Sequence, residues 1–86
     1  MKEKIEKALN EFNKHKSKEV NATLINLKNN LIKIKFSGEL LCKICCLNDY
    51  FEDMMHGLRD NGIKNEIKWI NTDETCENYL VEYEIL

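Results

Sequence analysis

VNATLINLKNNLIKIKF, residues Val20 to Phe36, contains two short runs in which apolar and polar side chains alternate. Alternation with a period of two is typical of a half-buried strand. The polar stretch Lys28-Asn29-Asn30 separates the runs and indicates a turn, because asparagine tolerates positive φ. The segment therefore predicts a β-hairpin. The apolar positions that would face the core are Val20, Ala22 and Leu24 in the first strand and Ile32, Ile34 and Phe36 in the second.

Amphipathic segments lie on both sides of this hairpin. Lys2 to Lys16 has apolar residues at the i, i+3, i+4 and i+7 positions, which predicts a helix with one apolar stripe. A second helix is expected to begin with Asn48 or Asp49 as its N-cap and to stop at Asn61-Gly62. The expected stripes are Ile5, Ala8, Leu9 and Phe12 in the first helix, and Leu47, Phe51, Met54, Met55 and Leu58 in the second.

Two further strands follow the second helix. Ile63, Ile67 and Trp69 share one parity of a third strand, and the residues of one parity in Tyr79 to Ile85 are apolar. The predicted fold is a single α+β domain over residues 1–86, with the order α-β-β-α-β-β. Its two layers are two helices packed on one face of a small, mainly antiparallel four-stranded sheet. The Tyr79 to Ile85 strand, at the end of the chain, is expected to be an edge strand that could pair with its twin in a homodimer.

Composition and charge exclude several classes of function. The 86 residues are 43% hydrophobic and 33% charged, which is typical of a globular domain. A net charge of -2 provides no basic surface for a phosphate backbone, so nucleic-acid binding is not expected. The apolar stretches are too short to span a bilayer. Because Met1-Lys2-Glu3-Lys4 leads into the helix pattern without an apolar signal core, we expect a cytoplasmic protein in a reducing compartment.

Four cysteines are the most informative residues for function. Cys42, Cys45 and Cys46 lie between the hairpin and the second helix, and Cys76 precedes the last strand. The spacing of Cys42 and Cys45 is that at which a tight turn directs two thiolates at one ion. Cys46 is a further candidate ligand, and Cys76 becomes one if the last strand begins near the start of the second helix. The sequence thus predicts a binding module that holds zinc or an iron–sulfur cluster, with a cluster shared across a homodimer as one arrangement.

Two alternatives remain open at the level of sequence. Leucine and isoleucine flank the thiols, and free cysteine is among the most buried residue types, so the cysteines could be core residues of a structural or protein-interaction domain. A small-molecule binder with a pocket between the second helix and the sheet is the other alternative. No catalytic constellation is recognisable, and an enzyme is not expected. His15 and His56 are expected at the surface, whereas Gly57 should mark either close approach of another backbone or an early helix end.

From Ile5 to about Ile70, the chain resembles the C-terminal domain of NifU-type iron–sulfur scaffold proteins. The matching stretches are Ile5-Glu6-Lys7-Ala8-Leu9 for the helix, Val20 to Leu24 with Leu31 to Phe36 for the hairpin, and Gly38 with the Cys42/Cys45 pair for the loop. The resemblance implies that Cys42 and Cys45 hold a nascent cluster. The chain departs from the family in the three residues Glu39-Leu40-Leu41 before the first cysteine and in the additional fourth strand.

A fainter resemblance covers Cys46 to Ile85. A cysteine before a helix, a following strand, Thr75-Cys76 and a final aromatic strand are similar to the vinyl-reductase-like small-molecule-binding domains. That family normally has a further cysteine near the position of Tyr83, which this chain lacks. The resemblance implies ligand binding without identifying the ligand.

Overall fold

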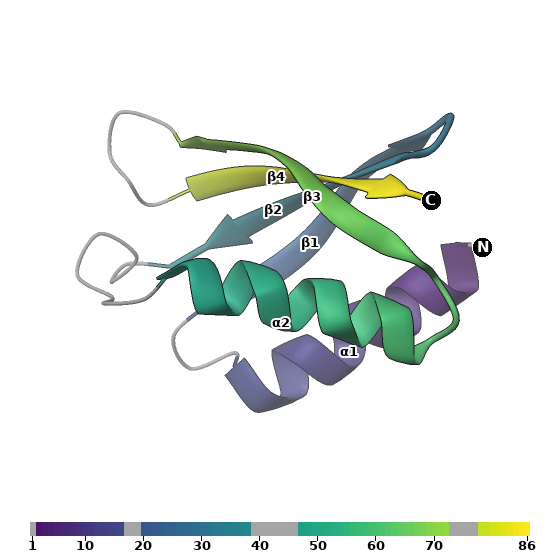
Figure 1. The fold of residues 1–86 in the computed structure, drawn as a ribbon. Coiled ribbons are helices and arrows are strands. Elements are labelled where there is room, and N and C mark those ends of the chain that lie inside the picture. Colours follow the sequence, from purple (N-terminus) through teal and green to yellow (C-terminus); the bar gives the residue numbers. More distant parts are fainter. Residues whose placement is uncertain (1, 17–19, 39–46, 73–77) are drawn as a thin grey trace.

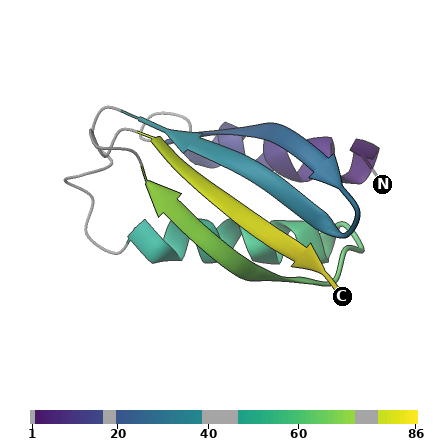
Figure 2. The same cartoon turned by 90° about the horizontal axis from the view of Figure 1, so that it is seen from above.

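The computed structural model describes residues 2–16, 20–38, 47–72 and 78–86. In chain order the elements are α1 (Lys2–Lys16), β1 (Asn21–Lys28), β2 (Leu31–Ser37), α2 (Leu47–Asp60), β3 (Asn65–Thr72) and β4 (Asn78–Ile85). The two helices lie side by side on one face of the four-stranded sheet (Figures 1 and 2). The α+β class and the element order predicted from the sequence are confirmed. The expected N-cap at Asn48 or Asp49 is wrong, because α2 begins at Leu47 and both residues lie inside it.

The sheet has the order β1-β2-β4-β3, and all its pairings are antiparallel. β4 therefore lies inside the sheet, with β2 on one side and β3 on the other. The prediction that Tyr79 to Ile85 forms an edge strand is wrong, because β4 pairs along both of its sides. A homodimer cannot form by pairing this strand with its twin, and β1 and β3 are the edge strands.

The chain passes through the order helix, strand, strand twice, and the second strands of the two units meet at the centre of the sheet. We call this β2–β4 pairing the central seam; Ile34 lies opposite Val81 near its middle. The helices run antiparallel, since Lys4 near the start of α1 lies beside Gly62, just past the end of α2 (Figure 1). The arrangement resembles a two-fold relation between two αββ halves.

The core lies between the helix layer and the sheet. Phe36, on β2, is at its centre, with its ring centroid 5.5 Å from that of Phe12 on α1 and 5.0 Å from that of Phe51 on α2. The predicted apolar stripes are confirmed where side chains are described, with Leu24 and Met55 only partly buried and Leu47 outside the described side chains. The core contains several fully buried side chains. These are Ile5, Val20, Ile32, Ile34, Phe36, Met54, Leu58, Val81 and Tyr83.

Both edge strands contain a β-bulge. In β3 the register shifts between Ile67, opposite Tyr83, and Trp69, opposite Glu82, so that Lys68 is the extra residue. Trp69 therefore turns to the outer face, where it is 57% exposed, and the prediction that it shares a face with Ile67 is wrong. β1 has a similar shift at Ile25. Bulges twist the edges of a sheet and hinder pairing with another chain.

The edge of β1 is further closed by a side chain from α1. The Asn13 carboxamide donates from Nδ2 to the Ala22 carbonyl at 2.9 Å and accepts at Oδ1 from the Ala22 N–H at 2.8 Å. Both backbone groups of Ala22 that point away from β2 are thereby satisfied by one side chain. Asn13 takes the place that a residue of an additional strand would occupy.

We expect Asn13→Ala to lower the free energy of unfolding by about 1 to 3 kcal/mol, because it leaves a partly buried N–H and a carbonyl of β1 without these partners. Urea denaturation followed by circular dichroism measures the change. Asn10→Ala on the exposed face of α1 is the matched control, because it makes the same change in helix propensity without this contact. Equal stabilities of the two variants would contradict the assignment.

The end of α2 has the hydrogen-bond pattern of a Schellman motif. Gly62, at φ 85°, donates its N–H to the Arg59 carbonyl at 2.9 Å, and Ile63 donates to the Leu58 carbonyl at 3.0 Å. Glycine adopts this φ without strain, so the predicted stop at Asn61-Gly62 is confirmed. The expectation for Gly57 is wrong: α2 continues to Asp60, and a Cβ on Gly57 would meet none of the described atoms within 4 Å.

Tyr83 connects β4 to α2. Its side chain is buried, and its hydroxyl donates a hydrogen bond of 2.9 Å to the Phe51 carbonyl. Burial raises the pKa of the Tyr83 phenol well above its ordinary value of about 10. The unfolded chain therefore loses this proton near pH 10, whereas the folded protein keeps it to higher pH. The stabilisation is complete below pH 10 and is lost as the pH rises above that value.

For Tyr83→Phe we expect about 1 kcal/mol less stability than wild type at pH 8, because one hydrogen bond is lost. Above pH 10 the wild type should lose up to about 1.4 kcal/mol per pH unit through this phenol, and the variant lacks that loss. The difference between the two proteins should therefore shrink and then reverse. Denaturation midpoints of both proteins measured from pH 8 to 11 test this. If the stabilities of wild type and Tyr83→Phe fell in parallel with pH, the buried phenol would not be the cause of the loss in wild type.

Candidate functional site

The four cysteines that the sequence indicates as ligands, Cys42, Cys45, Cys46 and Cys76, lie outside the described residues. The structure instead shows where the chain leaves and re-enters the fold around them. The end of β2, the start of α2, the end of β3 and the start of β4 all lie at one end of the molecule (Figures 1 and 2). We call this region the loop end.

Pairing across the sheet defines the loop end at the residue level. Ser37, the last residue of β2, lies opposite Asn78, the first residue of β4. Tyr79 follows Asn78, and its ring centroid is 5.7 Å from that of Phe51 on α2. β4 thus begins close to the early part of α2, which is the condition that the sequence set for Cys76 to join the other cysteines.

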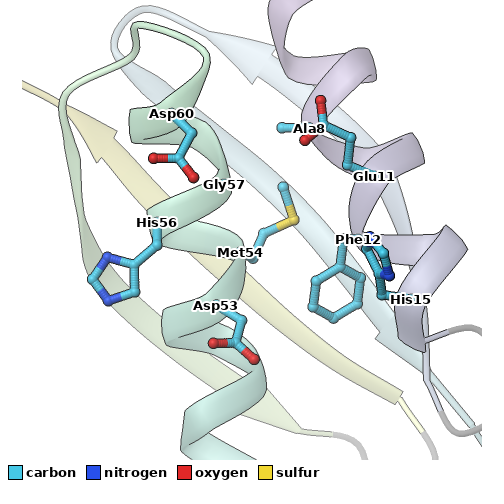
Figure 3. Close-up of a pocket in the computed structure, with 9 residues that line it drawn as sticks. All are labelled: Ala8, Glu11, Phe12, His15, Asp53, Met54, His56, Gly57 and Asp60. Atoms are coloured by element: carbon cyan, nitrogen blue, oxygen red, sulfur yellow. The ribbon is translucent and has the colours of Figure 1, made fainter.

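In the described part of the helix layer, a groove lies between α1 and α2. It has a volume of about 410 Å³ and lies on the side of the helices that faces away from the sheet (Figure 3). We call it the interhelical groove. Its floor is apolar, and carboxylates occupy its rim. The lining residues are Ala8, Glu11, Phe12, His15, Asp53, Met54, His56, Gly57 and Asp60.

The two histidines of the groove do not face each other. His15 lies beside Phe12 on α1, whereas the His56 ring is on the side of α2 away from α1 (Figure 3). Both side chains are exposed, as the sequence predicted. In the part of the chain that the structure describes, no group of three or more His, Cys, Asp or Glu residues could hold a metal ion.

Sequence reasoning did not find the interhelical groove. Its pocket hypothesis concerned the space between the second helix and the sheet, where Phe51, Met54 and Leu58 are buried core residues. The available signal was the pair of small residues Ala8 and Gly57 on the helices, because facing small side chains leave room between two helices. Such a pair becomes informative only when the helices are known to be neighbours.

The outer face of the sheet, which the helices leave uncovered, has a mixture of charges. Lys33 of β2 lies 3.6 Å from Glu82 of β4, and Lys68 of β3 lies 3.4 Å from Glu84. Pairs of this kind, on a solvent-facing surface, contribute little stability. Lysines of β2 and β3 lie beside glutamates of β4, so positive and negative charges are interspersed on this face. The face does not form a basic surface for a phosphate backbone.

Comparisons with known proteins found no match among protein-family models, curated proteins or solved structures. The resemblance to NifU-type scaffold domains therefore stays a prediction from the sequence. None of the described helices is long and apolar enough to cross a membrane.

Proposed function

We propose that this protein is a small, non-enzymatic binding module of the cytoplasm in which Cys42 and Cys45 hold zinc or an iron–sulfur cluster, with Cys46 and Cys76 as further ligands. The observation that supports it best is the pairing of Ser37 with Asn78 at the loop end. The segment that contains Cys42, Cys45 and Cys46 therefore leaves the sheet at Ser37, opposite Asn78, where the segment that contains Cys76 returns to it.

Chain length is consistent with convergence of the thiols. An extended chain spans at most about 3.6 Å per residue, so Cys76, two residues before Asn78, has a reach of up to about 7.2 Å, and Cys46 is bonded directly to Leu47 of α2. Cys42 is five residues beyond Ser37, a reach of up to about 18 Å. Two anchored segments with four thiols therefore supply enough ligands for one ion or cluster.

The chemistry of the donor set suits these groups. Thiolates are the ligands that zinc prefers in four-coordinate structural sites and that hold iron–sulfur clusters. A bound metal would tie the segment before α2 to the segment before β4. Metal binding of this kind adds to the free energy of folding, so a chelator should lower the stability of the metal-loaded protein.

Reconstitution tests the proposal. We expect the wild-type protein to take up zinc, or to develop iron–sulfur absorption under anaerobic reconstitution. Cys42→Ser should lose at least tenfold in metal affinity, because the substitution removes one of the thiolate ligands. Metal analysis and absorption spectra give the readout, and circular dichroism of the apo-proteins checks that the variant folds. If the wild-type protein bound neither zinc nor an iron–sulfur cluster, the proposal would be wrong.

Thiol reactivity distinguishes the alternative of buried core cysteines. Ligand thiols should react with an alkylating reagent in the native apo-protein and be protected when metal is added. Core thiols should react only when the protein unfolds, with or without metal. The second result would favour a structural or protein-interaction domain.

A further inference from the structure

We propose that the interhelical groove is the docking site for a basic amphipathic helix of a partner protein. This inference does not depend on the cysteines, because the groove is lined only by residues of α1 and α2. It rests on the shape of the floor, the charge of the rim and two residues that reduce the stability of α2.

The floor of the groove forms a hole for one large apolar side chain. Ala8 and Phe12 of α1 and Met54 and Gly57 of α2 surround it (Figure 3). A Cβ built on Gly57 would have no atom of the described residues within 4 Å, so the hole has space for a partner side chain at this point. A side chain that inserts into a hole formed by four residues is the contact by which helices pack in coiled coils.

The rim of the groove is acidic. Glu11 lies on the α1 side and Asp60 lies on the α2 side, and none of the nine lining residues is lysine or arginine. Arg59, next to Asp60 in sequence, donates from its Nη2 to the Asn65 carbonyl at 3.1 Å and so serves β3. Electrostatic complementarity then favours a partner with lysine or arginine on both sides of its apolar anchor.

Two groove residues are unfavourable for the helix that contains them. Gly57 lies inside α2, where glycine is less stable than alanine, and no described neighbour requires its small size. Asp60 is in the last turn, where a negative charge opposes the helix dipole. Residues that break local rules without a structural reason are expected at functional positions.

The shape of the groove favours a helix as the occupant. It is an open channel between two antiparallel helices, and its lining runs from Asp53 to Asp60 on α2, a length of about 12 Å that suits about two turns of a partner helix. A second copy of this chain fits less well. A symmetric dimer would place the same patch of each copy against the other and bring the two acidic rims together.

A model peptide provides the probe. It has about 18 residues of leucine and lysine, with leucine at helical i, i+3, i+4 and i+7 spacing, a terminal dye and a control version with glutamate in place of lysine. Fluorescence anisotropy at low salt measures binding to the full chain. We expect the lysine peptide to bind at least tenfold more tightly than the glutamate peptide.

Variants of the protein locate the binding site. Gly57→Leu fills the hole and should weaken the lysine peptide at least tenfold, whereas Gly57→Ala, a smaller change that favours the helix, should weaken it less. Glu11→Gln with Asp60→Asn should weaken binding at least fivefold. The matched control, Glu3→Gln with Glu6→Gln, also removes two negative charges, but at positions outside the groove. Its affinity for the lysine peptide should stay within twofold of that of wild type.

Several results would overturn the inference. These are equal affinity for the two peptides, equal losses in the groove and control charge variants, or unchanged binding by a folded Gly57→Leu variant. Sedimentation that shows a dimer of wild type but a monomer of Gly57→Leu would assign the groove to a second copy instead. Cys42→Ser should bind the peptide like wild type, so failure of the metal proposal and failure of this one are distinguishable.

Discussion

Phe36→Ala is expected to lower the free energy of unfolding by about 3 to 5 kcal/mol, the range found when a buried phenylalanine is truncated. The Phe36 side chain is fully buried, and its ring contacts aromatic rings from both helices, Phe12 on α1 and Phe51 on α2. A domain of 86 residues has a total stability of roughly 4 to 13 kcal/mol. The substitution should therefore remove a large part of it, and urea denaturation followed by far-ultraviolet circular dichroism gives the value.

Trp69→Ala is the matched control for this prediction. It also truncates an aromatic residue on a strand, but Trp69 is 57% exposed on the outer face of the sheet. We expect a change of no more than about 0.5 kcal/mol, as for surface substitutions in general. If the two variants lost similar stability, the core would not be where the packing of Phe36 places it.

Asn65→Asp should be the most damaging substitution that leaves side-chain size unchanged, with a loss of about 3 to 5 kcal/mol at neutral pH. Asn65 is fully buried at the start of β3, and its Nδ2 donates to the Ile63 carbonyl at 2.9 Å and to the Met55 carbonyl at 3.2 Å. Its Oδ1 has no partner among the described residues. A carboxylate there would face two carbonyl oxygens without a proton to donate.

The loss in Asn65→Asp should depend on pH. Burial and the carbonyl neighbours disfavour the charged form, so the introduced carboxyl has a folded-state pKa above its ordinary value of about 3.9. The variant keeps its stability below that ordinary value and loses it as the pH rises towards the folded-state pKa. Its difference from wild type should therefore be smaller at pH 4 than at pH 7.

The control for this pH dependence is Asn71→Asp, an exposed asparagine on the same strand. It should stay within about 0.5 kcal/mol of wild type at both pH values. Chemical denaturation at pH 4, 5.5 and 7 gives the profile for the three proteins. A deficit of Asn65→Asp that is equal at all pH values would mean that the lost amide donors, rather than a buried charge, account for it.

The local parts of the fold could be predicted from the sequence because they depend on neighbouring residues. The alternation of Ile32, Ile34 and Phe36 and the helical spacing from Ile5 to Phe12 each follow from which side chains must face the core. The position of β4 in the sheet depends on which distant strand pairs with it, and no local pattern encodes that choice. The prediction of the face on which Trp69 lies failed for a related reason. The bulge at Lys68 adds one residue, which reverses the alternation after it, and the bulge can be recognised only from the pairing with β4.

The candidate sites differ in how much of them the sequence reveals. The thiols of Cys42 and Cys45 are visible as a motif, whereas the nearness of the start of β4 to α2 required the central seam and the contact of Tyr79 with Phe51. The interhelical groove combines residues from two helices that are far apart in the chain. The small residues Ala8 and Gly57 were the signal for the groove, and they become informative only when the two helices are known to be neighbours.

The central seam also bears on how the chain folds. Its pairs join residues as distant as Leu31 and Glu84, so the sheet closes only after most of the chain has been brought together. Each αββ half on its own would leave one side of its second strand without hydrogen-bond partners and its core only partly covered. Closing so long a loop costs chain entropy before any contact offsets it, which slows folding. We therefore expect the two halves to gain their structure together in one cooperative transition, with the meeting of β2 and β4 as the slow event.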